Sequence, residues 1–360
     1  MSCKPFRSSE QRRAFGDNCF DVIRLVAAVA VMLGHIVTHL QLNIPSFFNT
    51  VHQSFPGVIV LFFLSGYLIT ASADREKSSN NSQKTIRYAL SRFFRIYPAI
   101  IACLIVSIIS IIVLYNPVAP FIEWIKWIGS QITFGQFYSP DFLEGYGVGA
   151  PNGSLWTIPI EIQWYIIAWI VTPWLKRRRV VEYVQLIIGA IVVSCVYPFT
   201  QTILPRPIYL LIDVTVIPYF YLFLLGSLLY FKRESLGKTI TKYWWVFLSM
   251  YLLWSHLNFQ KRIFALGTYC DILSGVLLSL SVFSCGYALG KVRLRADLSY
   301  GIYIYHMVVV NIFVHLFGRG SLVNGLIIVV VSLFCSLLSW YCVEKPCGKL
   351  KGRILRRLLR

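Results

Sequence analysis

The chain has 360 residues, of which 57% are hydrophobic and 14% charged, and its formal net charge is +19. So large an apolar share and so small a charged share exclude an ordinary soluble domain and indicate a polytopic membrane protein. The positive charge does not indicate a nucleic-acid partner, because the basic residues gather in short loops between apolar segments, as they do on the cytosolic side of membrane proteins.

Ten segments are apolar and about long enough, at roughly 20 residues, to cross a bilayer as helices. Their approximate ranges are 20–40, 54–73, 94–115, 154–175, 180–200, 207–231, 243–258, 263–290, 297–318 and 321–343. The first segment is not a cleavable signal, because it has full spanning length and no small-residue cleavage site behind it. Between the third and fourth segments, the Trp-rich first half of 116–153 predicts a short amphipathic helix in the membrane interface.

The distribution of lysine and arginine predicts the orientation of these segments. With the N-terminus in the cytosol, 28 of the 34 basic residues fall in cytosolic segments, five in outer segments, and Arg24 within the first helix. Cytosolic loops carry such an excess. We therefore expect an all-α fold of about ten transmembrane helices with both termini in the cytoplasm.

The chain 1–360 is expected to form a single membrane domain, with helices over roughly 20–343 and a basic cytoplasmic tail at 344–360. Glu344 and Lys345 precede Pro346 at the end of the last segment, which predicts a helix stop and an interfacial anchor. The nine cysteines form no CxxC pair, and most lie in apolar runs. They predict neither a disulfide nor a metal site.

The first helix carries two residues that a membrane span normally avoids, Arg24 and His35. Eleven residues separate them, close to a whole number of helical turns, so they share a face about 16 Å apart along the axis. Arg24 alone is explained by snorkelling to the interface. His35 lies near mid-membrane, where an ionisable group by default marks a functional site. His39, one turn further on, serves equally well as structural glue or as part of the site.

Two later helices add ionisable groups at depth. Glu161 is the one acid of its span, and a buried carboxylate demands a partner. His306 lies well inside the ninth segment, on one face with Ser299 and Tyr303. The alternative to a functional role is, for each residue, a structural hydrogen bond between helices. For His306 the structural and functional roles are equally favoured, whereas for Glu161 the functional role is favoured.

The third segment begins with Arg92 and Arg95, three residues apart at the cytosolic end. Guanidinium groups bind phosphate oxygens, so these arginines are candidates for a phosphate clamp. For Arg92, the charge bias of cytosolic loops is the favoured explanation. In the second segment, Ser65 and Gly66 favour a close helix crossing over a nucleophilic serine. Together the positions suit a phosphate-bearing donor that arrives from the cytosol and reacts inside the membrane.

The chain resembles the membrane-bound acyltransferase-3 family. The resemblance rests on four stretches in the family's order: FDVIR with Arg24 and His35, FFLSGYLI followed by RFFRIYP, GSLWTIPIEIQWY, and LSYGIYIYH. They span residues 20 to 306. The family O-acylates sugars of bacterial surface polysaccharides and related acceptors.

The resemblance implies an acyltransferase of the bacterial inner membrane that takes an acyl group, usually acetyl, from cytosolic acetyl-CoA. It implies transfer to a hydroxyl of a polysaccharide or its lipid-linked precursor. Arg24 and His35 match the family's arginine–histidine motif, while Glu161 and His306 match its later polar positions. His35 is then the general base, and Arg24, Arg92 and Arg95 the candidate CoA-binding residues. Glu161 and His306 divide the orienting, sugar-binding and oxyanion roles in either order, and a ping-pong route stays open.

Two other classes of protein are compatible with the same residues. A transporter or flippase for a lipid-linked sugar also uses buried His and Glu, although the sequence has no repeat and no paired broken helices. A structural membrane protein predicts that changes at His35, Glu161 and His306 affect stability alone.

Overall fold

The structure is a computed structural model that describes residues 18–47, 54–76, 81–261, 271–290, 292 and 294–358. Every regular element in these ranges is helical, which confirms the all-α prediction. The α-helices are α2 (Phe20–His39), α4 (Gly57–Arg75), α5 (Asn81–Leu114), α6 (Phe121–Ile132), α7 (Thr157–Leu175), α8 (Val180–Val196), α9 (Arg206–Asp213), α10 (Phe220–Phe231), α11 (Gly237–Lys242), α12 (Trp244–Lys261), α13 (Ile272–Ala288), α14 (Ser299–Phe317), α15 (Leu322–Ser339) and α16 (Lys345–Leu358).

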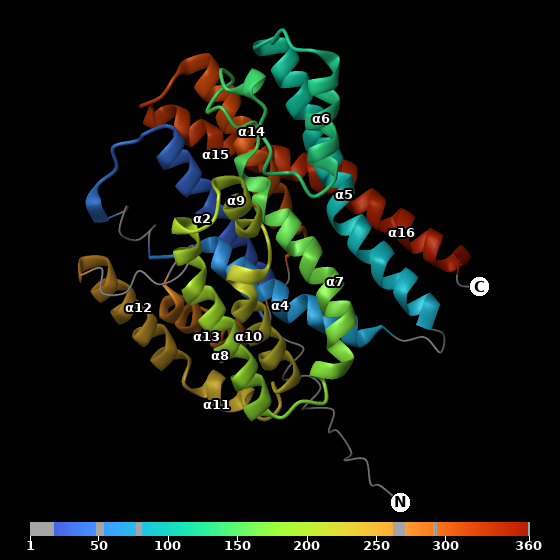
Figure 1. Cartoon of the computed structure of the whole chain (residues 1–360), viewed down its shortest axis with the longest axis vertical. Helices are drawn as coiled ribbons and strands as arrows, with labels where there is room; N and C mark the ends of the chain where they lie inside the picture. Colours follow the sequence, from blue (N-terminus) through green and yellow to red (C-terminus); the bar gives the residue numbers. More distant parts are fainter. Residues whose placement is uncertain are drawn as a thin grey trace, which may run out of the picture.

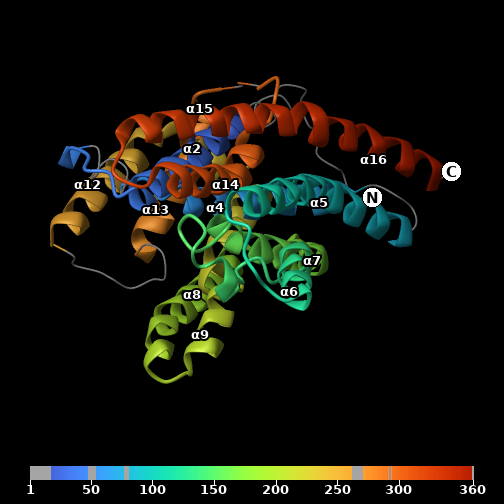
Figure 2. The same cartoon turned by 90° about the horizontal axis from the view of Figure 1, so that it is seen from above.

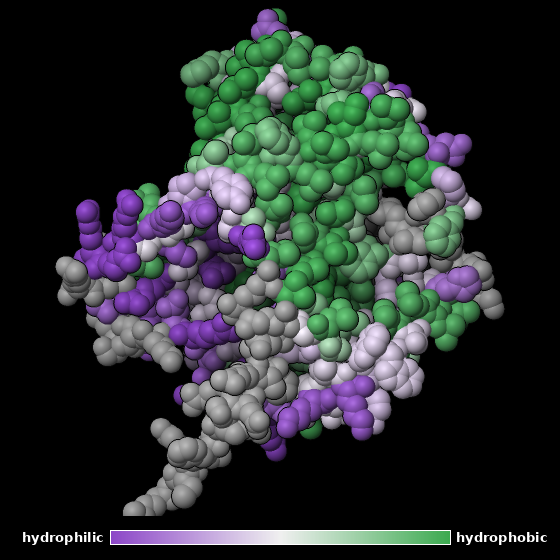
Figure 3. Space-filling view, turned by 180° about the vertical axis from the view of Figure 1, so that it is seen from behind, coloured by the Kyte–Doolittle hydropathy of each residue, from purple (hydrophilic) through white to green (hydrophobic). Residues whose placement is uncertain are grey.

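Seven helical stretches of the described chain are long and apolar enough to cross a membrane. They are Phe20–His39, Gly57–Arg75, Asn81–Leu114, Gly153–Leu175, Val180–Thr200, Ser299–Phe317 and Leu322–Arg357. Large apolar side chains remain exposed on them, and Figure 3 shows apolar residues covering a broad part of one face, with hydrophilic residues gathered beside it. A surface of this kind suits lipid rather than water, so the chain is an integral membrane protein.

The predicted span 207–231 is not one helix. It breaks between α9 and α10, where the short turn Ile217–Tyr219 contains Pro218, which has no N–H to donate and obstructs a continuous helix. The side chain of Gln163 stabilises the break: its Nε2 donates to Val214 O at 3.0 Å, and its Oε1 accepts from Val216 N at 3.2 Å. Irregular backbone inside a membrane protein needs such partners.

Two further predicted spans are also not matched by a full apolar helix. α12 begins at Trp244 and covers the rest of the predicted span 243–258, but it does not reach the apolarity of the seven stretches. For 263–290, the described part is helical from Ile272, where the Asp271 side chain caps the helix by accepting from Ser274 N at 2.8 Å. Residues 262–270 lie outside the described chain.

The predicted helix stop near Pro346 is wrong. The chain passes from α15 through one wider turn of π-helix, Trp340–Glu344, directly into α16, which continues to Leu358. A proline ring obstructs the carbonyl four residues earlier in a regular α-helix, and a π-turn at that point changes the register. The basic tail is therefore an extension of the last span. The predicted amphipathic helix before α7 is confirmed as α6.

The helices α4 and α10 cross with their backbones in contact, which confirms the close packing predicted at Gly66 but not at its neighbour Ser65. A Cβ on Gly66 would meet Phe223 Cα and O at 2.6 Å, and one on Gly226 would meet Phe63 O at 2.6 Å. Only glycine allows so close an approach at these two points. This crossing leaves Ser65 to face the other side of α4, toward the pocket described below.

The helix α2 packs against both α4 and α14, and these three helices form the centre of the molecule (Figures 1 and 2). α6 and the loop after it lie at one end, and α11 lies at the opposite end (Figure 1). α14 begins beside Arg24 and runs toward the α6 end, where the His315 Nε2 lies 3.1 Å from Leu114 O.

The loop before α7 is tied to α14 by the side chain of Asn311. Its Nδ2 donates to Ala150 O at 3.0 Å and Pro151 O at 3.1 Å, and its Oδ1 accepts from Val148 N at 2.8 Å. Gly147 has φ +60°, and a Cβ there would meet Asn311 Oδ1 at 2.2 Å, so this turn requires glycine. The loop and α14 thus form one hydrogen-bonded unit.

Candidate active site

Two parallel helices bring the two deep histidines together. α2 and α14 pack side by side, with Arg24 beside Asp297 at one level and His35 beside His306 at the next. The His35 Nδ1 lies 2.7 Å from the His306 Nε2, and the rings stack with centroids 5.0 Å apart. His306 is fully buried, whereas His35 is partly exposed. The His39 ring lies 5.6 Å from His35.

The hydrogen bonds fix the tautomers of a neutral pair. The His306 Nδ1 lies 2.9 Å from Ile302 O, and a carbonyl only accepts, so this nitrogen carries the proton. The His306 Nε2 is then an acceptor, and the His35 Nδ1 must donate to it. The lone pair of His35 therefore sits on Nε2, as in other sites where one ring nitrogen is held so that the other acts as a base.

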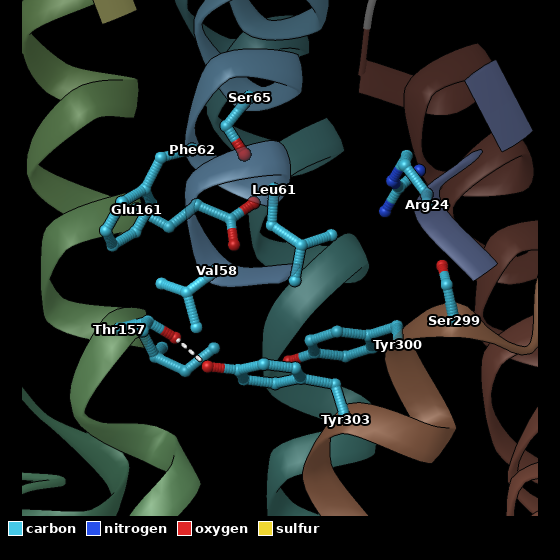
Figure 4. Close-up of a pocket in the computed structure, with 11 residues that line it drawn as sticks. Arg24, Val58, Leu61, Phe62, Ser65, Thr157, Glu161, Ser299, Tyr300 and Tyr303 are labelled. Atoms are coloured by element: carbon cyan, nitrogen blue, oxygen red, sulfur yellow. Dashed lines mark hydrogen bonds between the residues drawn. The ribbon is translucent and has the colours of Figure 1, made fainter. Parts of the chain in front are cut away.

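A pocket of about 60 Å³ lies between Arg24 of α2, Ser65 of α4, Glu161 of α7 and the first turns of α14. We call it the inner pocket. In Figure 4 the Arg24 and Glu161 side chains reach into it from opposite sides. Tyr303 forms part of its wall and donates to or accepts from the Thr157 hydroxyl at 2.8 Å. The Tyr303 ring also contacts the His306 ring, with centroids 6.2 Å apart, so the inner pocket adjoins the histidine pair.

Glu161 is held by its own helix rather than by an imidazole. Tyr165 lies one turn further along α7, and its hydroxyl donates to the Glu161 carboxylate. No hydrogen bond or ion pair joins Glu161 to His35 or His306 among the described contacts. The geometry thus places Glu161 with Arg24 in the inner pocket, one wall away from the histidine pair.

The three predicted arginines do not form one cluster. Arg95 pairs with Asp297 at 2.9 Å, and Arg24 pairs with the same carboxylate at 3.6 Å. Arg92 lies apart, where its Nη2 donates to the Ser72 hydroxyl at 2.8 Å and its guanidinium lies over the Tyr165 ring, 5.1 Å from the centroid. Arg24 and Arg95 are therefore positioned by a carboxylate, and Arg92 by an aromatic face.

Sequence reasoning missed Asp297, the carboxylate at the centre of this ion-pair cluster. Partial burial would raise the pKa of Asp297, but the neighbouring Arg95 and Arg24 outweigh it and hold that pKa well below its usual range. Ser299 also donates to Asp297, at 2.6 Å. Glu344 was interpreted as an anchor, yet its carboxylate lies 3.9 Å from Arg95. The sequence did contain a signal for Asp297, because it is an acidic residue shortly after the basic residues of the loop before α14.

The fold and the site define an integral membrane protein with a histidine pair inside its helices and an arginine-lined pocket beside it. A family model described as an acyltransferase domain matches residues 17–343. The chain belongs to this acyltransferase-3 family, which confirms the resemblance found in the sequence, and it is an acyltransferase.

Three curated proteins are similar to the chain. It is 27% identical to nodulation protein 10 of Rhizobium leguminosarum bv. viciae, over 95% of this chain and 96% of the relative. It is 27% identical to the O-acetyl transferase of Shigella phage Sf6, over 91% of this chain and 95% of the relative. It is 26% identical to the peptidoglycan O-acetyltransferase OatA of Listeria monocytogenes, over 49% of this chain and 28% of that protein. No solved structure matches the chain.

Proposed function

We propose that the protein is an O-acetyltransferase that moves an acetyl group from acetyl-CoA to a sugar hydroxyl of a cell-surface polysaccharide or its lipid-linked precursor. The family supports acyl transfer, and two of the relatives carry O-acetyl transfer in their names. The proposal places the enzyme in the bacterial inner membrane. It also keeps ten membrane crossings with both termini in the cytosol, which the excess of basic residues in the corresponding loops supports.

The observation that carries the proposal is the hydrogen bond between His35 and His306. His35 Nε2 takes the proton from the acceptor hydroxyl as its oxygen attacks the thioester carbonyl carbon. The carbon–sulfur bond breaks, and the protonated His35 returns the proton to the departing CoA thiolate. The products are the acetyl ester and free CoA thiol.

In this scheme His306 is a positioning residue. Its Nδ1–H is held by Ile302 O, so its Nε2 presents a lone pair to His35 and stabilises the imidazolium that forms during transfer. This arrangement resembles the way a carboxylate orients the histidine of a catalytic triad. A neutral imidazole in that role stabilises the cation less than a carboxylate does, because it brings no negative charge.

The donor is assigned to the Arg24 side of the inner pocket. Arg24 and Arg95 stay fixed on Asp297 and offer their remaining N–H groups to phosphate oxygens, and Arg92 is a third candidate. From Arg24 the pantetheine arm has about 16 Å to cover along α2 to reach His35. Glu161, opposite Arg24, is assigned to the acceptor or pantetheine amides through its carboxylate oxygens.

The test uses purified protein in nanodiscs with acetyl-CoA labelled in the acetyl group, with and without polysaccharide or its lipid-linked precursor from the host cell. We expect label in the glycan together with an equal release of free thiol. Both should be lost in His35→Ala and kept in His256→Ala, a control on α12 away from the site. Movement of a lipid-linked sugar across the bilayer without thiol release would favour the transporter instead.

A further inference from the structure

A second hollow, of about 90 Å³, lies at the α6 end of the molecule, and we call it the outer pocket. The last turns of α6, the turn at 133–139 and the loop 150–156 before α7 surround it. It lies outside the inner pocket and outside the histidine pair.

The lining of the outer pocket combines aromatic rings with side-chain amides. Its aromatic walls include Trp127, Tyr138 and Trp156, and its amides are Gln131, Gln136 and Asn152. Among the residues that the structure describes, no lysine, arginine, aspartate or glutamate lines it. A phosphate or a CoA nucleotide would find no counter-charge there, so the pocket suits a neutral ligand.

Gln136 points to the kind of ligand. The side chain is 2% exposed, and its Nε2 donates to Thr133 O, but its buried Oε1 has no partner among the described residues. Buried acceptors without a partner are rare in folded proteins and call for an explanation. A ligand hydroxyl that donates to this oxygen would complete its hydrogen bonding.

A sugar ring meets both features of the lining. Its hydroxyls donate to and accept from amides, which offer both functions in one group. Its C–H faces lie flat on the electron-rich faces of aromatic rings such as Trp. Pockets that bind small molecules commonly join an apolar wall with a few placed polar groups in this way.

The outer pocket is connected to the histidine pair by direct contacts with α14. Asn152 Nδ2 donates to Ile304 O at 2.8 Å, and Ser154 donates to Tyr303 O at 3.0 Å. A Cβ on Gly153 would lie 4.0 Å from Met307, the residue after His306.

The outer and inner pockets also adjoin one another at the start of α7. Trp156 lines the outer pocket, whereas the next residue, Thr157, lines the inner pocket. The Trp156 ring packs on Phe62 of the inner pocket, with centroids 6.2 Å apart. The two hollows thus lie on either side of one aromatic layer.

We propose that the outer pocket is a subsite for a neutral pyranose residue of the acceptor glycan, held by Gln136 and the aromatic walls. This inference rests on the proposed acetyl transfer for its role, but not for its binding chemistry. Donor and acceptor then approach the histidine pair from opposite ends of the helices.

The test measures sugar binding apart from catalysis, by the tryptophan fluorescence of the protein in nanodiscs. The probes are methyl α-D-glucopyranoside, methyl α-D-galactopyranoside and N-acetylglucosamine, with glucose 6-phosphate as the charged comparison. We expect saturable quenching by at least one neutral sugar in the wild type and equally in His35→Ala. Gln136→Leu, similar in size, should bind about tenfold more weakly, as the loss of one good hydrogen bond predicts. Phe134→Ala, an exposed position in the same turn, should bind as the wild type does.

Several outcomes overturn the proposal: no quenching by any neutral sugar, equal binding by Gln136→Leu, or stronger binding of glucose 6-phosphate. A kinetic measurement separates the subsite from the proposed function. Gln136→Leu should raise the acceptor KM while leaving the acetyl-CoA KM unchanged. If sugar binds and depends on Gln136 but no acetyl group is ever transferred, the subsite stands and the acetyltransferase proposal fails.

Discussion

The imidazoles of His35 and His306 meet at 2.7 Å although 271 positions separate them in the sequence. The contact exists because α2 and α14 pack in parallel with their ends in register, Arg24 beside Asp297 and His35 beside His306. A change that shifts one helix along the other would break this hydrogen bond and separate Arg24 from Asp297 together. The site therefore reports on helix register.

The histidine pair should behave as one unit in catalysis. We expect His35→Ala to lower kcat by about 10²–10⁴, the range for a placed general base. His306→Ala should cost a large part of the same factor, and the double variant should be no slower than His35→Ala, because residues that act together are not additive. Thiol release from acetyl-CoA in nanodiscs measures all three. A double variant slower by the product of the single effects would mean two independent roles.

Removing the Asp297 charge should loosen both arginines that it holds. We expect Asp297→Asn to destabilise the folded protein by about 1.5–3 kcal/mol, the usual range for hydrogen bonds to charged groups. The acetyl-CoA KM should rise several-fold. Thermal unfolding in detergent and initial rates test the two parts. Asp141→Asn, at the exposed start of the short 3-10 helix Asp141–Leu143, is the matched control. An unchanged KM would remove Arg24 and Arg95 from the donor site.

The same carboxylate predicts a pH dependence. Its folded-state pKa lies below the ordinary value of 3.8, so its stabilisation is complete above that value and is lost as pH falls through the lower folded-state pKa. The difference in stability between wild type and Asp297→Asn should be constant from about pH 8 to pH 5 and shrink below about pH 4. Unfolding measured across this range checks it. A difference that shrinks already near neutral pH would contradict the ion-pair assignment.

The crossing of α4 and α10 should not accept a side chain at its centre. Gly66→Ala places a Cβ against the Phe223 backbone, which cannot move as a side chain would. We expect a loss of about 1–3 kcal/mol, as for other overpacked cores. Gly189→Ala on α8 is the control, since nothing lies within 4 Å of a Cβ there. Folded yield and thermal unfolding are the measurements, and equal stability of the two variants would show that the crossing is loose.

Periodicity and composition predicted the parts of this protein that a single helix determines. The eleven-residue spacing placed Arg24 and His35 on one face, and the apolar lengths identified the seven spanning stretches. Composition wrongly predicted one continuous helix over 207–231, because both halves of this segment are apolar although Pro218 divides them. The wrong helix stop at Pro346 had the same origin, because sequence does not show that a π-turn will absorb a proline.

The sequence did not predict which side chains on different helices contact one another. His306 was selected for its depth, but nothing in spacing shows that its partner is His35. Glu161 was expected to serve an imidazole or a sugar, and only the packing of α7 reveals Tyr165 as its holder. Asp297 lies in a loop among basic residues, so in the sequence it looks like ordinary charge balance. Only the structure shows that Arg24 and Arg95 both pair with it.

The Asn311 side chain binds three backbone groups of the loop before α7, and that loop forms part of the wall of the outer pocket. Asn311 sits on the same helix as His306, a little more than one turn away. Reshaping this wall therefore means either breaking the hydrogen bonds of the Asn311 amide or moving the helix that carries His306. Selectivity of the outer pocket should therefore come from its preformed shape rather than from a loop that closes over the bound acceptor. Acceptors that do not fit should be rejected at binding, before any thioester is consumed.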